Sequence, residues 1–318
     1  MNTRIGAVIE HADLPFSQAM TRAGIAAKLG ADSLWLSQLP GHRETGTLLT
    51  GLALHTEDVM IGTAILPTST RPPVVMAQTA LTIDELSGGR VVLGLGAGHR
   101  MLGEWMLGGT HAATVAAMRE YLTIVTDLIR DGEVNVTGQV FQGHTLYTGP
   151  RRADLPVFLG CFGPRMLELA AELADGVILW LCSPEYTREH VLPSLRAGWA
   201  RRTGGHEDFT IAIMIRAVLT SETGRAREDL RRTLNGYLRM PNYQRLMRAS
   251  GFADDVRAGR FSDAALDVLT AAGSPARLSE LVTAYREAGA TDVLVVPAGE
   301  AHHDQSRFAA TLEAAIDG

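Results

Sequence analysis

Short apolar runs alternate along the chain with longer segments in which apolar residues recur every three or four positions. The first pattern predicts buried strands, and the second predicts amphipathic helices. Strands that alternate with helices are typical of a parallel sheet covered by helices. Eight strands are expected, over residues 4–10, 33–37, 60–65, 91–95, 157–160, 177–180, 210–219 and 292–297. Eight such repeats predict a closed (β/α)8 barrel, or TIM barrel, and we expect one domain over residues 1–318.

Helices are expected between most of these strands. The helix over 73–86 has the clearest limits, because Pro72 and Pro73 suit a first turn and Gly88 suits a left-handed cap. Residues 134–147 alternate apolar with polar residues and glycine, so they predict a short β excursion before the fifth strand. The other predicted helices cover residues 16–29, 47–55, 112–130, 164–174 and 275–288.

The segment from about 225 to 272 is too long for one crossover helix of a minimal barrel. It predicts a helical insertion after the seventh strand. Its large apolar residues could form a lid over the barrel, a dimer surface or a plain packing face, and the sequence leaves all three open. These residues are Tyr237, Met240, Tyr243, Leu246 and Met247.

Composition narrows the classes of function. The chain has 318 residues, 46% of them hydrophobic, and can bury a large core. Its formal net charge of −6 comes without the basic stripe that nucleic-acid binding requires. No apolar run could span a bilayer and no signal segment is visible, so a cytoplasmic protein without membrane contact is expected. Two cysteines, Cys161 and Cys182, are too few for a disulfide framework or a four-thiolate metal site.

In a parallel barrel, chemistry is expected at the carboxyl ends of the strands. The fourth strand ends in Gly96, Ala97, Gly98 and His99. This differs from a dinucleotide-binding turn, which follows the first strand of its unit and leads directly into a helix. Gly96 and Gly98 instead leave room for a flat ring to approach the backbone. His99 at the rim could donate a proton near neutral pH, or could be only a hydrogen-bonded loop residue.

A second candidate follows the fifth strand, where the chain passes through glycines into a helix with a proline in its first turn. Exposed N–H groups at a helix N-terminus attract anions, and Arg165 could add charge, so this turn is a candidate phosphate site. The alternative is an ordinary turn between a strand and a helix. The residues concerned are Gly160, Cys161, Phe162, Gly163 and Pro164.

A third candidate follows the second strand, where Ser37 and Gln38 end a buried run. Both could hydrogen-bond a ring or a substrate, and His42 is a weaker candidate for an acid or base. His302 and His303 are adjacent rather than one turn apart, and the other histidines are scattered, so no metal site is expected. No Ser-His-Asp set with a GxSxG turn occurs, which argues against hydrolysis.

Several of these segments together resemble a known family. GTAILPTSTRPPVVMAQTALTIDELSGGRVVLGLGAGHR, DLPVFLGCFGPRMLELAAELADGVILW and GATDVLVVP resemble the bacterial luciferase-like flavin and deazaflavin oxidoreductases, over about residues 5–297. GPRMLELAAELADGVILW is most similar to the branch that uses coenzyme F420, which includes methylenetetrahydromethanopterin reductase. The resemblance implies a (β/α)8 barrel, a homodimer, and a cofactor ring in the barrel mouth with its phosphate near the fifth-strand loop.

The resemblance also assigns positions. It implies a non-prolyl cis peptide within Thr63, Ala64 and Ile65, which would shape the ring pocket. His99 stands where the sugar-phosphate dehydrogenases of this branch carry a glutamate proton donor, and Gln38 stands where they carry a histidine. These departures argue against a sugar phosphate as substrate. The cofactor-lining positions implied by the match are Gly96, Ala97, Gly98, His99, Gly160, Cys161, Phe162, Gly163 and Trp180.

The sequence and the resemblance together predict an oxidoreductase that transfers a hydride between coenzyme F420 and a small organic substrate, with reduction of a C=C or C=N bond. His99 and Gln38 are the catalytic candidates, while Ser37 and Arg165 are candidates for cofactor binding. Two alternatives stay open. One is an FMN-dependent two-component monooxygenase on the same fold, and the other is a non-catalytic barrel that binds a protein partner through the insertion.

Overall fold

The computed structural model describes residues 3–99, 104, 108 and 114–318 of the chain. Eight parallel strands close into a barrel, since β10 pairs with β9 on one side and with β12 on the other. The eight expected strands and the predicted TIM barrel are therefore confirmed. In order around the barrel the strands are β1 (Arg4–Val8), β2 (Ser33–Leu36), β3 (Met60–Thr63), β5 (Val91–Gly96), β8 (Val157–Gly160), β9 (Gly176–Trp180), β10 (Thr210–Leu219) and β12 (Asp292–Pro297).

Side chains from these strands fill the barrel interior. Trp35 is 2% exposed, and its indole stacks on Phe158 with the ring centroids 6.1 Å apart. Glycines make room for this ring, because a Cβ at Gly62 would lie 2.5 Å from it and a Cβ at Gly6 would lie 2.8 Å from its Nε1. The interior cluster consists of Val8, Trp35, Ala64, Val92, Phe158, Ile178, Ala212, Leu294 and Val296.

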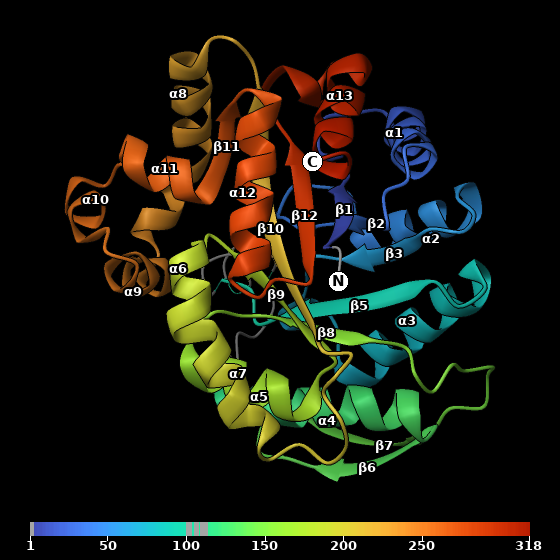
Figure 1. The fold of residues 1–318 in the computed structure, drawn as a ribbon. Coiled ribbons are helices and arrows are strands. Elements are labelled where there is room, and N and C mark those ends of the chain that lie inside the picture. Colours follow the sequence, from blue (N-terminus) through green and yellow to red (C-terminus); the bar gives the residue numbers. More distant parts are fainter. Residues whose placement is uncertain (1–2, 100–103, 105–107, 109–113) are drawn as a thin grey trace.

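Helices pack around the outside of the barrel and bury a second, larger apolar cluster against the strands (Figure 1). The predicted limits of α3 are confirmed, because the helix begins at Pro73 and is capped by Gly88 with a φ of 71°. The outer helices are α1 (Phe16–Lys28), α2 (Thr45–His55), α3 (Pro73–Ser87), α4 (Val115–Arg130), α5 (Pro164–Leu173), α7 (Leu192–Trp199), α12 (Pro275–Glu287) and α13 (Gln305–Ile316).

Shorter elements complete the outer layer. The expected β excursion is confirmed as an antiparallel hairpin of β6 (Glu133–Thr137) and β7 (Gln142–Leu146). The sequence analysis did not predict β4, α7 or α13, and the first residues of the expected helix over 112–130, 112 and 113, lie outside the described residues. The remaining short elements are β4 (Leu66–Pro67), η1 (Thr68–Thr70), α6 (Pro184–Tyr186), the π-helix η3 (Thr187–Val191) and η5 (Gly299–His302).

The predicted helical insertion after the seventh barrel strand is also confirmed. Figure 1 shows its helices grouped beside the barrel, on the side of the view opposite α1 and α2. The insertion ends in an unpredicted strand, β11, which pairs in parallel with the carboxyl end of β10. Its elements are α8 (Thr223–Leu234), η4 (Asn235–Arg239), α9 (Pro241–Ala249), α10 (Ala253–Ala258), α11 (Asp263–Leu269) and β11 (Thr270–Gly273). Among the described residues, no helix is both long enough and apolar enough to cross a membrane.

An ion pair between buried Asp84 and partly buried Arg152 joins α3 to the start of β5 and to the segment before β8. Asp84 is 2% exposed and accepts hydrogen bonds from Nε and Nη2 of Arg152, at 2.9 and 2.8 Å, and from the backbone N–H of Val91 at 3.0 Å. Removing one partner of such a pair leaves an uncompensated charge. We expect Asp84→Ala to lower the free energy of unfolding by about 3 kcal/mol, as measured by denaturant titration.

Asp254 provides the matched control for this prediction, because its side chain is 83% exposed while it pairs with Arg257 on α10. Exposed pairs contribute roughly 0–1 kcal/mol. Asp254→Ala should therefore unfold at nearly the same denaturant concentration as the parent protein. Equal losses in the two variants would contradict the structural role assigned to Asp84.

Candidate functional site

A cavity of about 600 Å³ opens at the carboxyl ends of the barrel strands. Its volume lies within the range of small-molecule and cofactor sites. Segments that follow β1, β2, β3, β5, β8 and β9 line it, together with residues of β10, β12 and the insertion. The cavity therefore occupies the place at which barrel enzymes carry out their chemistry.

Most of the residues expected in the site line this cavity. Two do not. The hydroxyl of Thr63 is buried between β3 and β5, where it donates to the Gly94 carbonyl at 2.8 Å and accepts from the Gly94 N–H at 3.0 Å. Arg165 is exposed on the first turn of α5, outside the lining. The expected residues that line the cavity are Ser37, Gln38, Ala64, Ile65, Gly96, Ala97, Gly98, His99, Gly160, Cys161, Phe162, Gly163 and Trp180.

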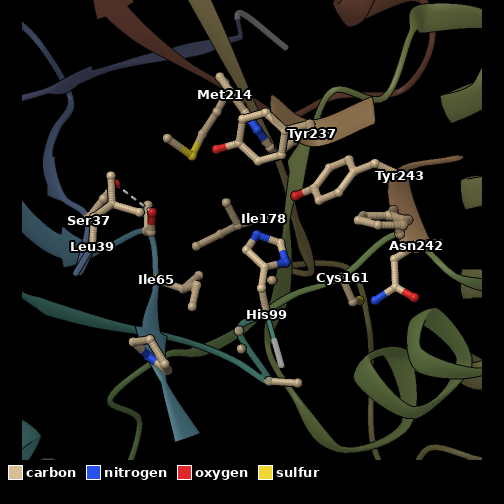
Figure 2. Close-up of a pocket in the computed structure, with 18 of the residues that line it drawn as sticks. Ser37, Leu39, Ile65, His99, Cys161, Ile178, Met214, Tyr237, Asn242 and Tyr243 are labelled. Atoms are coloured by element: carbon tan, nitrogen blue, oxygen red, sulfur yellow. Dashed lines mark hydrogen bonds between the residues drawn. The ribbon is translucent and has the colours of Figure 1, made fainter. Parts of the chain in front are cut away.

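One wall of the cavity is formed by the chain that follows β3. The peptide bond between Ala64 and Ile65 is cis, as the family resemblance implies. Ser37 donates its hydroxyl to the Ala64 carbonyl at 2.7 Å, and Figure 2 shows this bond beside the side chain of Ile65. The main role of the Ser37 hydroxyl in this structure is thus to hold the wall in place.

Glycines at the ends of β5 and β8 make room for Ile65. A Cβ at Gly96 would lie 2.9 Å from the Ile65 side chain, and a Cβ at Gly160 would lie 2.8 Å from it. Gly98 has a φ of 67°, a conformation that favours glycine. The sequence analysis assigned Gly96 and Gly98 to the approach of a ring and Gly160 to a candidate phosphate turn, and the structure adds that Gly96 and Gly160 accommodate Ile65.

Gln38 is committed to the backbone of the neighbouring helix. Its Oε1 accepts a hydrogen bond from the Thr45 N–H at 2.8 Å, at the first residue of α2. A carboxamide has no proton that titrates near neutral pH, so Gln38 cannot act as an acid or a base. Its amide N–H groups could still orient a bound molecule, which makes it a positioning residue.

His99 lies among aromatic rings supplied largely by the insertion. Its ring centroid is 5.5 Å from that of Tyr243 and 6.1 Å from that of Tyr237. Tyr243 also packs on Phe162, and Tyr237 packs on Trp180. Figure 2 shows the His99 ring directed into the cavity, facing both tyrosines.

The insertion therefore closes part of the barrel mouth. Tyr243 and Leu246 are 5% and 2% exposed, and both line the cavity. Burial raises the pKa of Tyr237 and of Tyr243, so both hydroxyls stay protonated at neutral pH. The sequence left open a lid over the barrel, a dimer surface and a plain packing face for these residues. The lid fits this geometry.

The two thiols are unreactive in this environment. Cys161 lines the cavity and Cys182 lies close by, and burial raises the pKa of both. A thiol that keeps its proton is a poor nucleophile. This agrees with their interpretation as residues without a chemical role.

Other cavity residues were missed in the sequence analysis. Glu10 and His11 follow β1, and Met214 and Arg216 point inward from β10. The signal that found Ser37, a polar residue after a buried strand, applies equally to Glu10 and His11. Nothing in the sequence showed that Arg216 would form an ion pair with Glu10 inside the barrel mouth.

Comparison with known proteins identifies relatives that match most of this chain. The 5,10-methylenetetrahydromethanopterin reductase of Archaeoglobus fulgidus is 26% identical over 301 residues, which cover 89% of this chain and 90% of the relative. The F420-dependent glucose-6-phosphate dehydrogenase of Kineococcus radiotolerans is 27% identical over 317 residues, with 92% and 89% covered.

Solved structures share the fold. An F420-dependent secondary alcohol dehydrogenase, solved in complex with an F420–acetone adduct, has a TM-score of 0.81 at 18% identity and covers 99% of each chain. The family model that matches this chain, over residues 2–292, is described as luciferase-like monooxygenase. The chain belongs to the luciferase-like monooxygenase family, among whose members its relatives include F420-dependent oxidoreductases.

Proposed function

We propose that the protein is a cytoplasmic oxidoreductase that transfers a hydride between coenzyme F420 and a small organic substrate, with reduction of a C=C or C=N bond. The observation that carries the proposal is the glycine-lined cavity at the barrel mouth in a chain whose relatives are named as F420-dependent enzymes. A homodimer, as the family resemblance implies, is part of the proposal.

The residues present fit a deazaflavin. Gly96 and Gly160 let the Ile65 side chain lie close to the backbone, and Gly98 adds no side chain, so this side of the cavity is a low apolar wall that would suit a flat ring. Besides the two ring nitrogens of His11, two polar atoms in the lining are buried without a hydrogen-bond partner in the described part of the chain, the Ser69 hydroxyl and Trp180 Nε1. Buried polar atoms without partners are rare in folded proteins, and the polar edge of a ring would supply partners.

The phosphate end of the cofactor would lie near the start of α5. Pro164 carries no N–H, and the Met166 N–H donates to the Gly163 carbonyl at 3.0 Å, so the Arg165 N–H is the first-turn group of this helix that could face an anion. Arg165, exposed on the same turn, would add positive charge without entering the cavity.

The cofactor supplies the hydride, and the protein binds, orients and manages the proton. Ile65, supported by Gly96 and Gly160, gives the ring an apolar surface. Tyr237 and Tyr243 exclude water from the mouth. His99 is directed into the cavity and is the candidate for proton transfer to the substrate.

The alternative on the same fold is an FMN-dependent two-component monooxygenase, which the description of the matching family model favours. The two functions differ in oxygen use. We expect no oxygen uptake above background when an oxygen electrode records the protein with FMN and a flavin reductase. Rapid oxygen consumption that depends on the protein would favour the monooxygenase.

A non-catalytic barrel that binds a partner through the insertion fits the site less well. Tyr243, Leu246 and Met247 are at most 5% exposed, and the first two face the cavity. These side chains are therefore not available to a protein partner on the surface.

A further inference from the structure

One buried histidine in the cavity has no role in the proposed cofactor site. His11 lies three residues beyond the end of β1 and is 2% exposed. Arg43 donates a hydrogen bond to its backbone carbonyl and so fixes the local chain. The side chain lines the cavity at the barrel mouth.

Neither ring nitrogen of His11 makes a hydrogen bond within the described part of the chain. The Ser37 carbonyl lies near the ring but not in hydrogen-bond geometry. Even if one nitrogen turned to this oxygen, the second would stay without a partner. A buried polar group left unpaired is costly, and in a cavity wall it is explained by a ligand that pairs with it.

A second histidine faces the first. The rings of His11 and His42 meet edge to face, with centroids 5.7 Å apart and planes at 79°, and both line the cavity. Burial lowers the pKa of both, and the proximity of His42 lowers the pKa of His11 further, so both rings are neutral at pH 7. A neutral imidazole offers one N–H donor and one acceptor nitrogen.

The two arginines in the described lining, Arg216 and Arg245, both have side-chain partners. Arg216 and Glu10 form an ion pair in the same lining, with side chains 15% and 29% exposed. The lining also includes the polar residues Ser37 and Gln38 and apolar residues such as Leu39, Met214 and Val296. Arg245 donates to Asn242, and Arg43 donates to the His11 backbone carbonyl from outside the lining. A neutral oxygen on an apolar body would match the histidine nitrogens and the apolar lining without needing a cation.

The barrel topology places the histidine pair across the mouth from the proposed cofactor residues. The strand order β1-β2-β3-β5-β8 puts β1 four strands from β8 in a ring of eight. His11 follows β1 and His42 follows β2. Gly160 is the last residue of β8, and residues 161–163 follow that strand. His11, with His42 beside it, therefore borders the space that would remain for a substrate when a cofactor occupies the β5 and β8 side.

We propose that His11 and His42 form a subsite that hydrogen-bonds a neutral carbonyl or hydroxyl oxygen of the substrate, so that the enzyme selects uncharged oxygen compounds over carboxylates and amines. This inference rests on the proposed function, because the proposed cofactor position decides which side of the cavity is left to the substrate.

The test uses the full-length protein labelled with 15N-histidine, free and loaded with oxidised F420. Cyclohexanone is titrated as the probe, with cyclohexanecarboxylate and cyclohexylamine as charged probes of similar shape. We expect cyclohexanone to shift the ring 15N resonances of His11 and His42, and to bind about tenfold more tightly than either charged probe. His11→Phe should weaken cyclohexanone binding by about tenfold, the equivalent of one hydrogen bond.

A structural role for His11 would give a different result. Phe removes unpaired polar atoms from a buried position. His11→Phe should therefore raise the thermal midpoint of the free protein while it weakens the binding of cyclohexanone. His55→Phe, at an exposed position on α2, is the matched control and should change neither. A lower midpoint with unchanged binding, preference for a charged probe, or unshifted His11 resonances would overturn the inference.

Cofactor binding separates this inference from the proposed function. F420 fluorescence is followed for the parent and for His11→Phe, and both should bind the cofactor equally. Intact F420 binding without a His11 response rejects the subsite alone. If F420 does not bind, the proposed function fails, and the response of the free protein still decides whether the histidine pair takes a neutral oxygen.

Discussion

Gly94→Ala is expected to prevent the protein from reaching its folded state. A Cβ at this position of β5 would lie 1.8 Å from the Thr63 carbonyl oxygen and 2.9 Å from its carbon. Both are backbone atoms of the neighbouring strand, so no side-chain rotation relieves the clash. Thr63 also exchanges two hydrogen bonds with Gly94, which hold the two backbones together.

The size of this effect follows from the atoms involved. Overpacking a core that can adjust costs roughly 1–3 kcal/mol, and here the adjustment would have to separate two barrel strands. We expect a loss of at least about 3 kcal/mol, seen as insoluble expression or as a large fall in the thermal midpoint.

Gly24→Ala is the control for this substitution. Gly24 lies in α1, and a Cβ there meets nothing within 4 Å. Alanine in place of glycine within a helix stabilises by roughly 0.5–1 kcal/mol. Similar thermal midpoints for the two variants would contradict the packing described for β3 and β5.

His99→Ala is expected to slow the chemical step by at least about 100-fold, the lower end of general acid–base contributions. The ring is directed into the cavity and faces Tyr237 and Tyr243. F420 affinity should change little. The measurement is a single-turnover oxidation of reduced F420 by a carbonyl or unsaturated substrate found in a screen, with cofactor binding followed separately.

His99→Phe distinguishes proton transfer from packing. Phenylalanine keeps an aromatic ring against Tyr243 and Tyr237 but carries no proton to transfer. If His99 manages the proton, the Phe variant is as slow as the Ala variant. Recovery of the rate in His99→Phe, or an unchanged rate in His99→Ala, would remove His99 from the chemistry.

The barrel could be predicted from the sequence because its strands are continuous apolar runs with clear ends. The start of α3 at Pro73 and its cap at Gly88 were equally visible. β4 has two residues and β11 has four small ones, Thr270–Gly273, so neither carries an apolar pattern of its own. Both form because a neighbouring barrel strand offers an edge for pairing.

Site residues could be predicted where they lie at or directly after the end of a strand. They were harder to predict where a contact across the barrel decides whether the side chain faces the cavity. Ser37, Gly96 and His99 follow strand ends and line the cavity as expected. Thr63 also ends a strand, but its hydroxyl bonds the next strand instead of facing the cavity. The position of Tyr237 depends on how the insertion folds back over the barrel, which no local pattern encodes.

The central claim is tested most directly by titrating the purified protein with oxidised and reduced F420, and in parallel with FMN, while fluorescence is recorded. We predict saturable binding of F420 that is at least about tenfold tighter than binding of FMN. Tighter binding of FMN, or binding of neither cofactor, would contradict the proposed deazaflavin-dependent hydride transfer.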